Sequence, residues 1–171
     1  YRKAMKAGYR ARAAYKLLEI QQKNEIIRPS DNVVDLGAAP GSWLQVLRDL
    51  TGGKVIGVDL NPIAPMEGVT TIIGDFTDPG VQERIREEAG GIVNVVVSDA
   101  SPKLSGQKSY DQARAIGLGE DALAFACTIL KPGGNMVIKS FQGELFGELL
   151  AETRKHFYSV RGYRTKASRK G

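Results

Sequence analysis

Polar side chains end four of the chain's apolar runs, and their types could bind a small molecule and move a proton. Asp59, Asp75 and Asp99 each close or follow a β-branched run, and Lys139 closes a fourth. In a parallel sheet the carboxyl ends of the strands meet at one edge, where ligands bind. Carboxylates there could accept hydrogen bonds from hydroxyl or amino groups, and a lysine could hold a proton. A single loop aspartate usually serves a turn, but four such run ends indicate a site.

The segment 33–43 is typical of the first strand and cofactor loop of a Rossmann-type sheet. An apolar run contains Asp35, a turn of small residues includes Gly37 and Gly41, and a helical pattern follows. Asp59 comes after Gly41 at about the twenty-residue spacing at which an acid meets a cofactor ribose. The sequence therefore predicts a pocket for a nucleoside cofactor.

The chemistry of this loop favours a cofactor that has no phosphate groups. Ala39 replaces the second glycine of the dinucleotide fingerprint, Pro40 has no amide donor, and the loop contains no lysine or arginine. S-adenosylmethionine has no phosphate and carries a positive sulfonium, so it fits this loop better than NAD. We keep NAD as the weaker alternative.

The acids predict how S-adenosylmethionine would lie. Its sulfonium would sit near Asp35 and Asp99, and its ribose hydroxyls would bind Asp59. Asp75 could accept the exocyclic amine of adenine while Phe76 packs on the ring. Asp35 could instead hydrogen-bond the backbone of the turn, and the sequence leaves both roles open.

Strand and helix patterns alternate along the chain, which predicts one α/β domain over residues 1–171. Helical patterns cover residues 9–22, 42–50, 79–89, 109–130 and 144–156. Strand patterns cover residues 33–36, 54–59, 69–73, 92–98, 135–140 and 158–163, with a turn at 131–134. We expect a Rossmann-like fold, a mostly parallel sheet with helices on both faces.

Charge is segregated along the chain, which has a net charge of +5. Residues 1–16 contain six basic residues and 154–171 contain seven, with no acid in either segment, whereas the middle holds all 19 acids. This pattern favours a polyanionic partner that the basic ends contact. Solvated terminal segments would give the same pattern.

Composition argues against several other classes of protein. No apolar run approaches the length of a membrane span, so we expect a cytoplasmic protein without a membrane partner. Cys127 is the single cysteine and lies in an apolar run, which predicts a buried thiol and no internal disulfide. His156 has no neighbouring ligand motif, so no metal site is expected.

The quoted residues resemble the FtsJ/RrmJ family of S-adenosylmethionine-dependent RNA ribose 2′-O-methyltransferases. The resemblance covers nearly the whole chain, through residues 8–17, 35–43, 58–60, 74–76, 98–102 and 137–143. The cofactor loop alone would indicate a methyltransferase of any kind. A lysine before the first strand, together with Asp99 and Lys139, is the more specific feature of 2′-O-methylation.

The resemblance implies roles for individual residues. The cofactor would be bound by Gly37, Gly41, Trp43, Asp59, Leu60, Asp75, Phe76 and Asp99. Lys16, Asp99 and Lys139 would be three members of the family's catalytic Lys-Asp-Lys-Glu tetrad. We expect the fourth member, a glutamate, in a final strand beyond Gly171, and not among the glutamates of the helical pattern 144–156.

The implied reaction is attack of a ribose 2′-hydroxyl on the methyl group of the sulfonium. Free lysine is protonated at neutral pH. Lys139 would therefore act either as a general base, once deprotonated, or as a charged group that orients the hydroxyl and stabilises the developing oxyanion.

The predicted RNA surface combines basic and aromatic side chains near the N-terminus with one polar loop. Its predicted cations are Arg10, Arg12 and Lys103, and Tyr9 and Tyr15 are predicted to stack on bases. The loop 103–108 is expected to close over the RNA.

The preferred substrate is a uridine of large-subunit ribosomal RNA, and the protein is expected to act as a monomer. A transfer RNA or a messenger RNA cap is the alternative within the same chemistry. A dinucleotide oxidoreductase and a catalytically silent RNA-binding module are alternatives of other classes. The three matching tetrad residues argue against the silent module.

Overall fold

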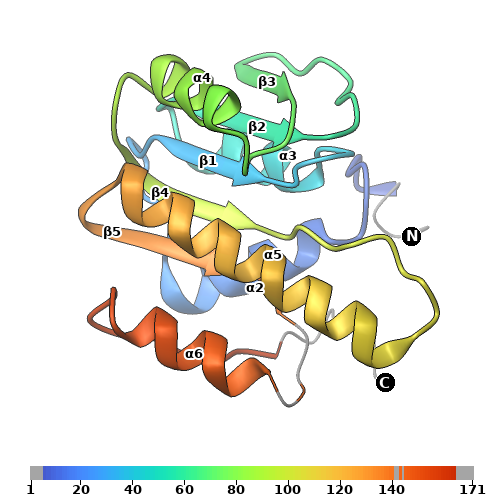
Figure 1. Ribbon diagram of the computed structural model, residues 1–171. Helices are drawn as coiled ribbons and strands as arrows, with labels where there is room; N and C mark the ends of the chain where they lie inside the picture. The colour runs from blue at the N-terminus through green and yellow to red at the C-terminus, as the bar shows by residue number, and fades with distance from the viewer. Residues whose placement is uncertain (1–5, 141–142, 144, 165–171) are drawn as a thin grey trace.

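The computed structural model describes residues 6–140, 143 and 145–164. At its centre is a parallel sheet of five strands in the order β3-β2-β1-β4-β5 (Figure 1). The strands are β1 (Val33–Leu36), β2 (Val55–Asp59), β3 (Val69–Ile73), β4 (Val93–Ser98) and β5 (Leu130–Ile138). The strand order changes direction beside β1, and α/β sheets bind ligands at the carboxyl side of such a switch point. The predicted Rossmann-like α/β fold is confirmed.

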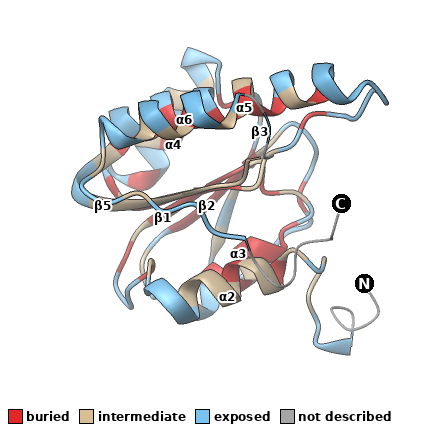
Figure 2. Ribbon diagram, turned by 90° about the horizontal axis from the view of Figure 1, so that it is seen from below, coloured by how far each residue is buried: buried red, intermediate tan, exposed pale blue. Residues whose placement is uncertain are grey.

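Helices cover both faces of the sheet, as Figure 2 shows. The helices α2 (Ala14–Asn24) and α3 (Ser42–Leu50) lie on one face. The other face carries α4 (Pro79–Ala89), α5 (Lys108–Ile129) and α6 (Phe146–Arg154). Neighbouring strand residues point to opposite faces, so Val33 joins the core under α2 and α3, whereas Val34 joins the core under α4 and α5. All four residues of β1 are buried, as expected for a central parallel strand.

Sequence patterns set most boundaries of these elements. The elements β1, α3, β3 and α4 have the bounds that the patterns predict. Helix α4 begins at Pro79 because the Asp78 side chain accepts hydrogen bonds from the backbone N–H groups of Gly80 and Val81. Helix α2 begins at Ala14, later than predicted, and in the segment before it the backbone N–H of Arg10 donates to the Gln45 side chain (2.8 Å).

Two predictions in the C-terminal third are wrong. Val93 pairs with Leu130 and Val95 pairs with Asn135, so the predicted turn 131–134 is a bulge inside β5. Residues 158–163 form no strand and do not pair with the edge strand β5. They pass near α2 instead, where the Lys23 Nζ lies 4.8 Å from the centre of the Tyr163 ring.

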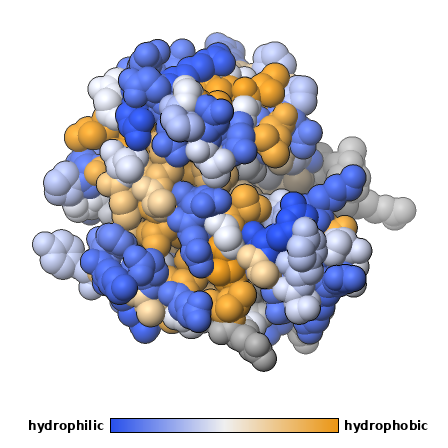
Figure 3. Space-filling model, in the orientation of Figure 1, coloured by the Kyte–Doolittle hydropathy of each residue, from blue (hydrophilic) through white to orange (hydrophobic). Residues whose placement is uncertain are grey.

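The face covered by α4, α5 and α6 is mostly hydrophilic, with hydrophobic patches between the charged groups (Figure 3). Cys127 is exposed, so the predicted buried thiol is wrong. Its neighbours Ala126 and Ile129 face the core, and the turn of the helix directs Cys127 outward. Within the described part of the chain, no helix is both long and apolar enough to cross a membrane.

Candidate active site

Two glycines shape the loop that follows β1. Gly37 has a φ of 74°, and a Cβ atom there would lie 2.7 Å from the Cβ of Ala100, so the loops after β1 and β4 approach each other too closely for any other residue. Gly41 has a φ of 114° and precedes the first residue of α3. Gly37 brings the loop next to the carboxyl end of β4, where Asp99 follows Ser98, and Gly41 faces Arg10 and Ile63.

Asp59 at the end of β2 is fixed toward this loop. Its Oδ2 accepts a hydrogen bond from the Ala39 N–H (2.9 Å), and its Oδ1 accepts one from the Asn61 N–H (2.8 Å). Each carboxylate oxygen can accept a second hydrogen bond, so Asp59 can still bind ribose hydroxyls. The next residue, Leu60, is 69% exposed and offers apolar surface beside it.

The structure places Asp75 and Phe76 in different environments. Asp75 is exposed, and hydrogen bonds from the Thr77 side chain and backbone to its Oδ1 lower its pKa. Its Oδ2 has no partner among the described residues, so it can accept an amine. Phe76 is only 7% exposed and packs in the core with Ile72 and Ile85. Little of its ring is therefore available to pack on adenine.

Asp35 is a buried acid in the central strand β1. It is 1% exposed, and neither carboxylate oxygen has a hydrogen-bond partner in the described part of the chain. Burial raises its pKa well above the usual value, and the negative charges of Asp99 and Asp59 raise it further. The alternative in which Asp35 hydrogen-bonds the turn backbone is therefore wrong. A buried acid without a partner suits a cation that enters the pocket.

Two lysines from distant parts of the sequence act on Asp99. The Nζ of Lys139 lies 3.6 Å from its Oδ1 and donates a hydrogen bond to the Ser101 Oγ (2.5 Å). Burial raises the pKa of Asp99, while the positive charges of Lys139 and Lys16 partly offset that effect. Lys139 is thus in contact with Asp99, and the charge of Lys16 acts on the same carboxylate. The contact of Ser101 with Lys139 was not predicted, although Ser101 lies within the motif 98–102.

Trp43 connects the N-terminal segment to the pocket. Its Nε1 donates a hydrogen bond to the Ala13 carbonyl (2.7 Å), and its ring is buried between α2 and α3. Beside it is a cavity of about 90 Å³, which Asp35, Asp99 and residues of the β1 loop also line. Trp43 therefore both lines this cavity and fixes the segment that carries Lys16.

Arg10 makes structural contacts that the sequence did not predict. Its guanidinium donates hydrogen bonds to the carbonyls of Pro40 (3.0 Å), Ala64 (2.8 Å) and Pro65 (3.3 Å). These carbonyls belong to the loops after β1 and β2, and the loop after β1 lines the cavity. Arg10 is therefore a structural tie between the two loops, and its contact with RNA phosphates stays a prediction.

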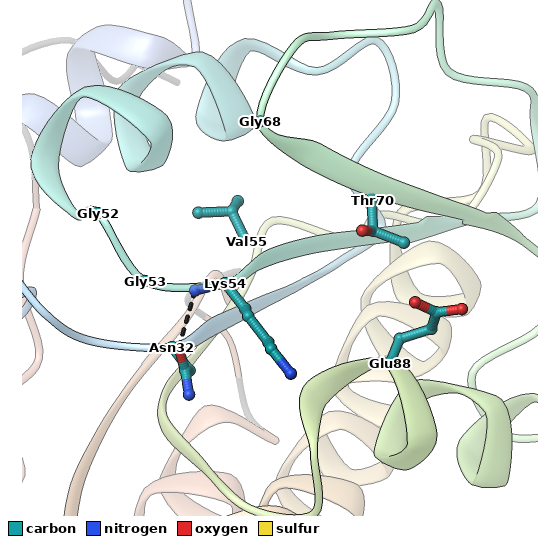
Figure 4. A pocket seen from close by; sticks show the side chains of 8 residues that line it. All are labelled: Asn32, Gly52, Gly53, Lys54, Val55, Gly68, Thr70 and Glu88. Carbon is teal, nitrogen blue, oxygen red and sulfur yellow. Dashed lines mark hydrogen bonds between the residues drawn. The ribbon is translucent and has the colours of Figure 1, made fainter.

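A larger hollow of about 480 Å³ lies at the opposite end of the strands, where β1, β2 and β3 begin (Figure 4). It is lined by residues that precede β1, β2 and β3, among them Asn32, Lys54 and Gly68. The Lys54 N–H donates to the Asn32 side chain (2.8 Å), and Glu88 faces the hollow from α4. Much of its lining is backbone, and it holds none of the residues that meet around Asp99. In the described residues, no group of histidine, cysteine and acidic side chains is arranged to hold a metal ion.

The fold and the pocket together define a Rossmann-like protein that binds a nucleoside cofactor. A family model described as FtsJ-like methyltransferase matches residues 9–171, so the chain belongs to that family. It is an S-adenosylmethionine-dependent methyltransferase, and the dinucleotide oxidoreductase alternative is wrong.

Individual relatives agree with this family. The chain is 94% identical to the ribosomal RNA large subunit methyltransferase E of Methanoculleus marisnigri, over 100% of this chain and 84% of that protein. It is 64% identical, with the same coverage, to the protein of that name in Methanosphaerula palustris. A solved ribosomal RNA methyltransferase from Plasmodium falciparum has a TM-score of 0.85 at 26% identity, covering 93% of both chains.

The tie made by Arg10 can be tested by its removal. We expect Arg10→Ala to weaken S-adenosylmethionine binding about fivefold, because hydrogen bonds worth about 1 kcal/mol each no longer hold the two loops. Titration calorimetry without RNA measures this change. The exposed neighbour Arg12 is the matched control, and Arg12→Ala should leave cofactor affinity unchanged. Normal cofactor binding by Arg10→Ala, with weakened RNA binding, would restore the predicted phosphate contact.

The buried charge of Asp35 makes a prediction about stability. Its folded-state pKa is raised, so its contribution to stability is present below the unfolded pKa of about 3.9 and is lost as pH rises through the folded pKa. We expect Asp35→Asn to raise the ligand-free Tm at neutral pH by about 2–4 °C for each kcal/mol gained, and to have little effect below pH of about 4.

Thermal unfolding across pH, followed by circular dichroism, measures this difference. Asp49 on α3 is exposed, so Asp49→Asn is the control and should show no pH-dependent gain. A lower Tm for Asp35→Asn at neutral pH would mean that the carboxylate stabilises the ligand-free fold, contrary to this account.

Proposed function

We propose that this chain transfers the methyl group of S-adenosylmethionine to a ribose 2′-hydroxyl of ribosomal RNA. The contact of Lys139 with Asp99 beside the cofactor pocket carries this proposal, and the charge of Lys16 acts on the same acid. A ribose hydroxyl is a poor nucleophile, so its attack needs a base or a group that stabilises the oxyanion. The names of the relatives, which specify large-subunit ribosomal RNA, support the choice of substrate.

The residues around the pocket fit S-adenosylmethionine. Both carboxylate oxygens of the buried Asp35 lack hydrogen-bond partners among the described residues, which suits a site for a cation, and Asp99 lines the same cavity. We assign the cofactor contacts to Gly37, Gly41, Trp43, Asp59, Leu60, Asp75 and Asp99, and we give Phe76 the role of shaping the pocket from the core. When bound, the cofactor supplies an electrophilic methyl group on a positively charged sulfur.

The lysines and Asp99 then act on the ribose hydroxyl. Ser101 and Asp99 hold the Lys139 amine at the carboxyl end of β5. From there Lys139 either takes the proton that the 2′-hydroxyl loses or, when charged, orients that oxygen and stabilises its developing negative charge. Lys16 adds a second positive charge on the same acid, which favours the anionic form of Asp99.

The finer assignments belong to the same proposal. We propose a uridine of the large-subunit RNA as the target and a monomeric, cytoplasmic enzyme. A transfer RNA or a messenger RNA cap is the alternative substrate for the same chemistry. Each would receive the methyl group on a ribose oxygen, so the identity of the labelled RNA separates them.

Mapping of transferred label tests this function. The chain is incubated with S-adenosylmethionine labelled in its methyl group and with total cellular RNA or isolated large ribosomal subunits, and the RNA is then digested to nucleosides. The proposal predicts label in one 2′-O-methylnucleoside of the large-subunit RNA. Label on a base, or no label in either RNA sample, would refute it.

Substitution of Lys139 separates catalysis from cofactor binding. We expect Lys139→Ala to keep its cofactor affinity and to lower the rate of methyl transfer about 10²- to 10⁴-fold, the usual contribution of a positioned acid–base group. Single-turnover kinetics and calorimetry measure the two quantities. Lys131 is an exposed lysine of the same strand, so Lys131→Ala is the control and should leave both unchanged. Retained turnover in Lys139→Ala would end this assignment.

A further inference from the structure

The segment 101–114 leaves the active site and ends in the first turns of α5. It follows Asp99 at the carboxyl end of β4, and Ser101 contacts the Lys139 amine. Figure 1 shows this loop extending beyond the carboxyl end of β4 before the chain turns back into α5. Any substrate that reaches the lysine therefore lies next to this segment.

Hydrogen bonds from α5 hold the loop in place. Asp111 is buried and accepts hydrogen bonds from the Ser105 N–H (2.9 Å), the Ser105 Oγ (2.7 Å) and the Gly106 N–H (3.3 Å). Arg114 Nη1 donates to the Lys103 carbonyl (3.2 Å). The loop 103–108, which was predicted to close over RNA, is thus held by hydrogen bonds to α5. It is therefore a preformed surface.

This supported segment displays an aromatic ring among positive charges. Tyr110 is 52% exposed, and the Arg114 guanidinium lies 5.6 Å from the centre of its ring. Lys103 and Lys108 are exposed on the same segment, whose single acid, Asp111, is buried and hydrogen-bonded. An aromatic ring with cations around it is the usual means of binding single-stranded nucleic acid.

The tyrosines predicted to stack on bases are engaged in other contacts. Tyr9 and Tyr15 pack edge to face, with their ring centres 5.7 Å apart. Tyr9 is also packed against the core under α2 and α3. Tyr110, by contrast, has a guanidinium near its ring and keeps half of its surface open.

We propose that Tyr110 stacks on a base of single-stranded RNA beside the target ribose, while Lys103 and Lys108 contact the neighbouring phosphates. This inference rests on the proposed function. It requires an unpaired substrate, because the bases of a duplex are stacked on each other and offer no free face to Tyr110.

Fluorescence anisotropy with two probes tests the stacking. One probe is a labelled oligouridylate, and the other is a ribose-phosphate oligomer of the same length without bases, which carries the same charge. Tyr110→Ala is expected to weaken oligouridylate binding about tenfold, within the range of base–aromatic stacking. Its affinity for the oligomer without bases should not change. Tyr110→Phe keeps the ring and should bind both probes as the unaltered chain does.

Tyr158 is fully exposed and follows α6, so Tyr158→Ala is the matched control and should bind both probes normally. The inference is overturned if Tyr110→Ala binds oligouridylate normally, if it loses affinity for both probes equally, or if the unaltered chain does not bind oligouridylate. These are binding measurements with a defined probe, so their failure differs from an absence of transferred methyl label, which would refute the proposed function.

Discussion

An acid buried without a partner is the constraint on which this structure depends. Asp35 lies in the central strand, with both oxygens shielded from water and without hydrogen bonds among the described residues. A carboxylate in such a place is costly to ionise. The neighbouring charges of Asp99 and Asp59 add to that cost. Without a ligand the raised pKa favours the protonated acid, and a cation in the pocket would favour the carboxylate, which makes Asp35 a functional feature of the fold.

The N-terminal segment completes the site around this acid. Trp43 holds the Ala13 carbonyl, and Arg10 joins the loops that follow β1 and β2. These contacts position α2, and the charge of its Lys16 acts on Asp99, while Lys139 reaches Asp99 from the end of β5. The two lysines are far apart in sequence, and the packing of α2 on α3 is what brings them to one carboxylate.

Local patterns predicted the frame of the molecule well. The bounds of the strand 33–36 and of the amphipathic helix 79–89 could be predicted from sequence. The signals that set them, hydrophobic periodicity and helix capping, involve only residues a few positions apart. The meeting of acids at one sheet edge also followed from strand order alone. The helical period could also have placed Cys127 outward, since Ala122, Phe125, Ala126 and Ile129 form the buried side of α5.

Contacts between distant segments could not be predicted in this way. The donors of Arg10 bind carbonyls about 30 and 54 residues away, and charge pattern alone assigns such an arginine to RNA. The bulge at 131–134 depends on the register of β5 against β4, and a strand at 158–163 would need a partner outside its own pattern. That Asp35 has no hydrogen-bond partner among the described residues is likewise a property of the packed fold.

Proton release on cofactor binding tests the central claim most directly. The heat of S-adenosylmethionine binding is measured across the acidic to neutral pH range in buffers of different ionisation enthalpy. If a cation in the pocket compensates for Asp35, binding lowers the pKa of that acid, and protons are released at pH values below its ligand-free pKa. The release should be smaller in Asp35→Asn. Binding heats that are independent of the buffer at every pH, or equal proton release in both proteins, would contradict the account.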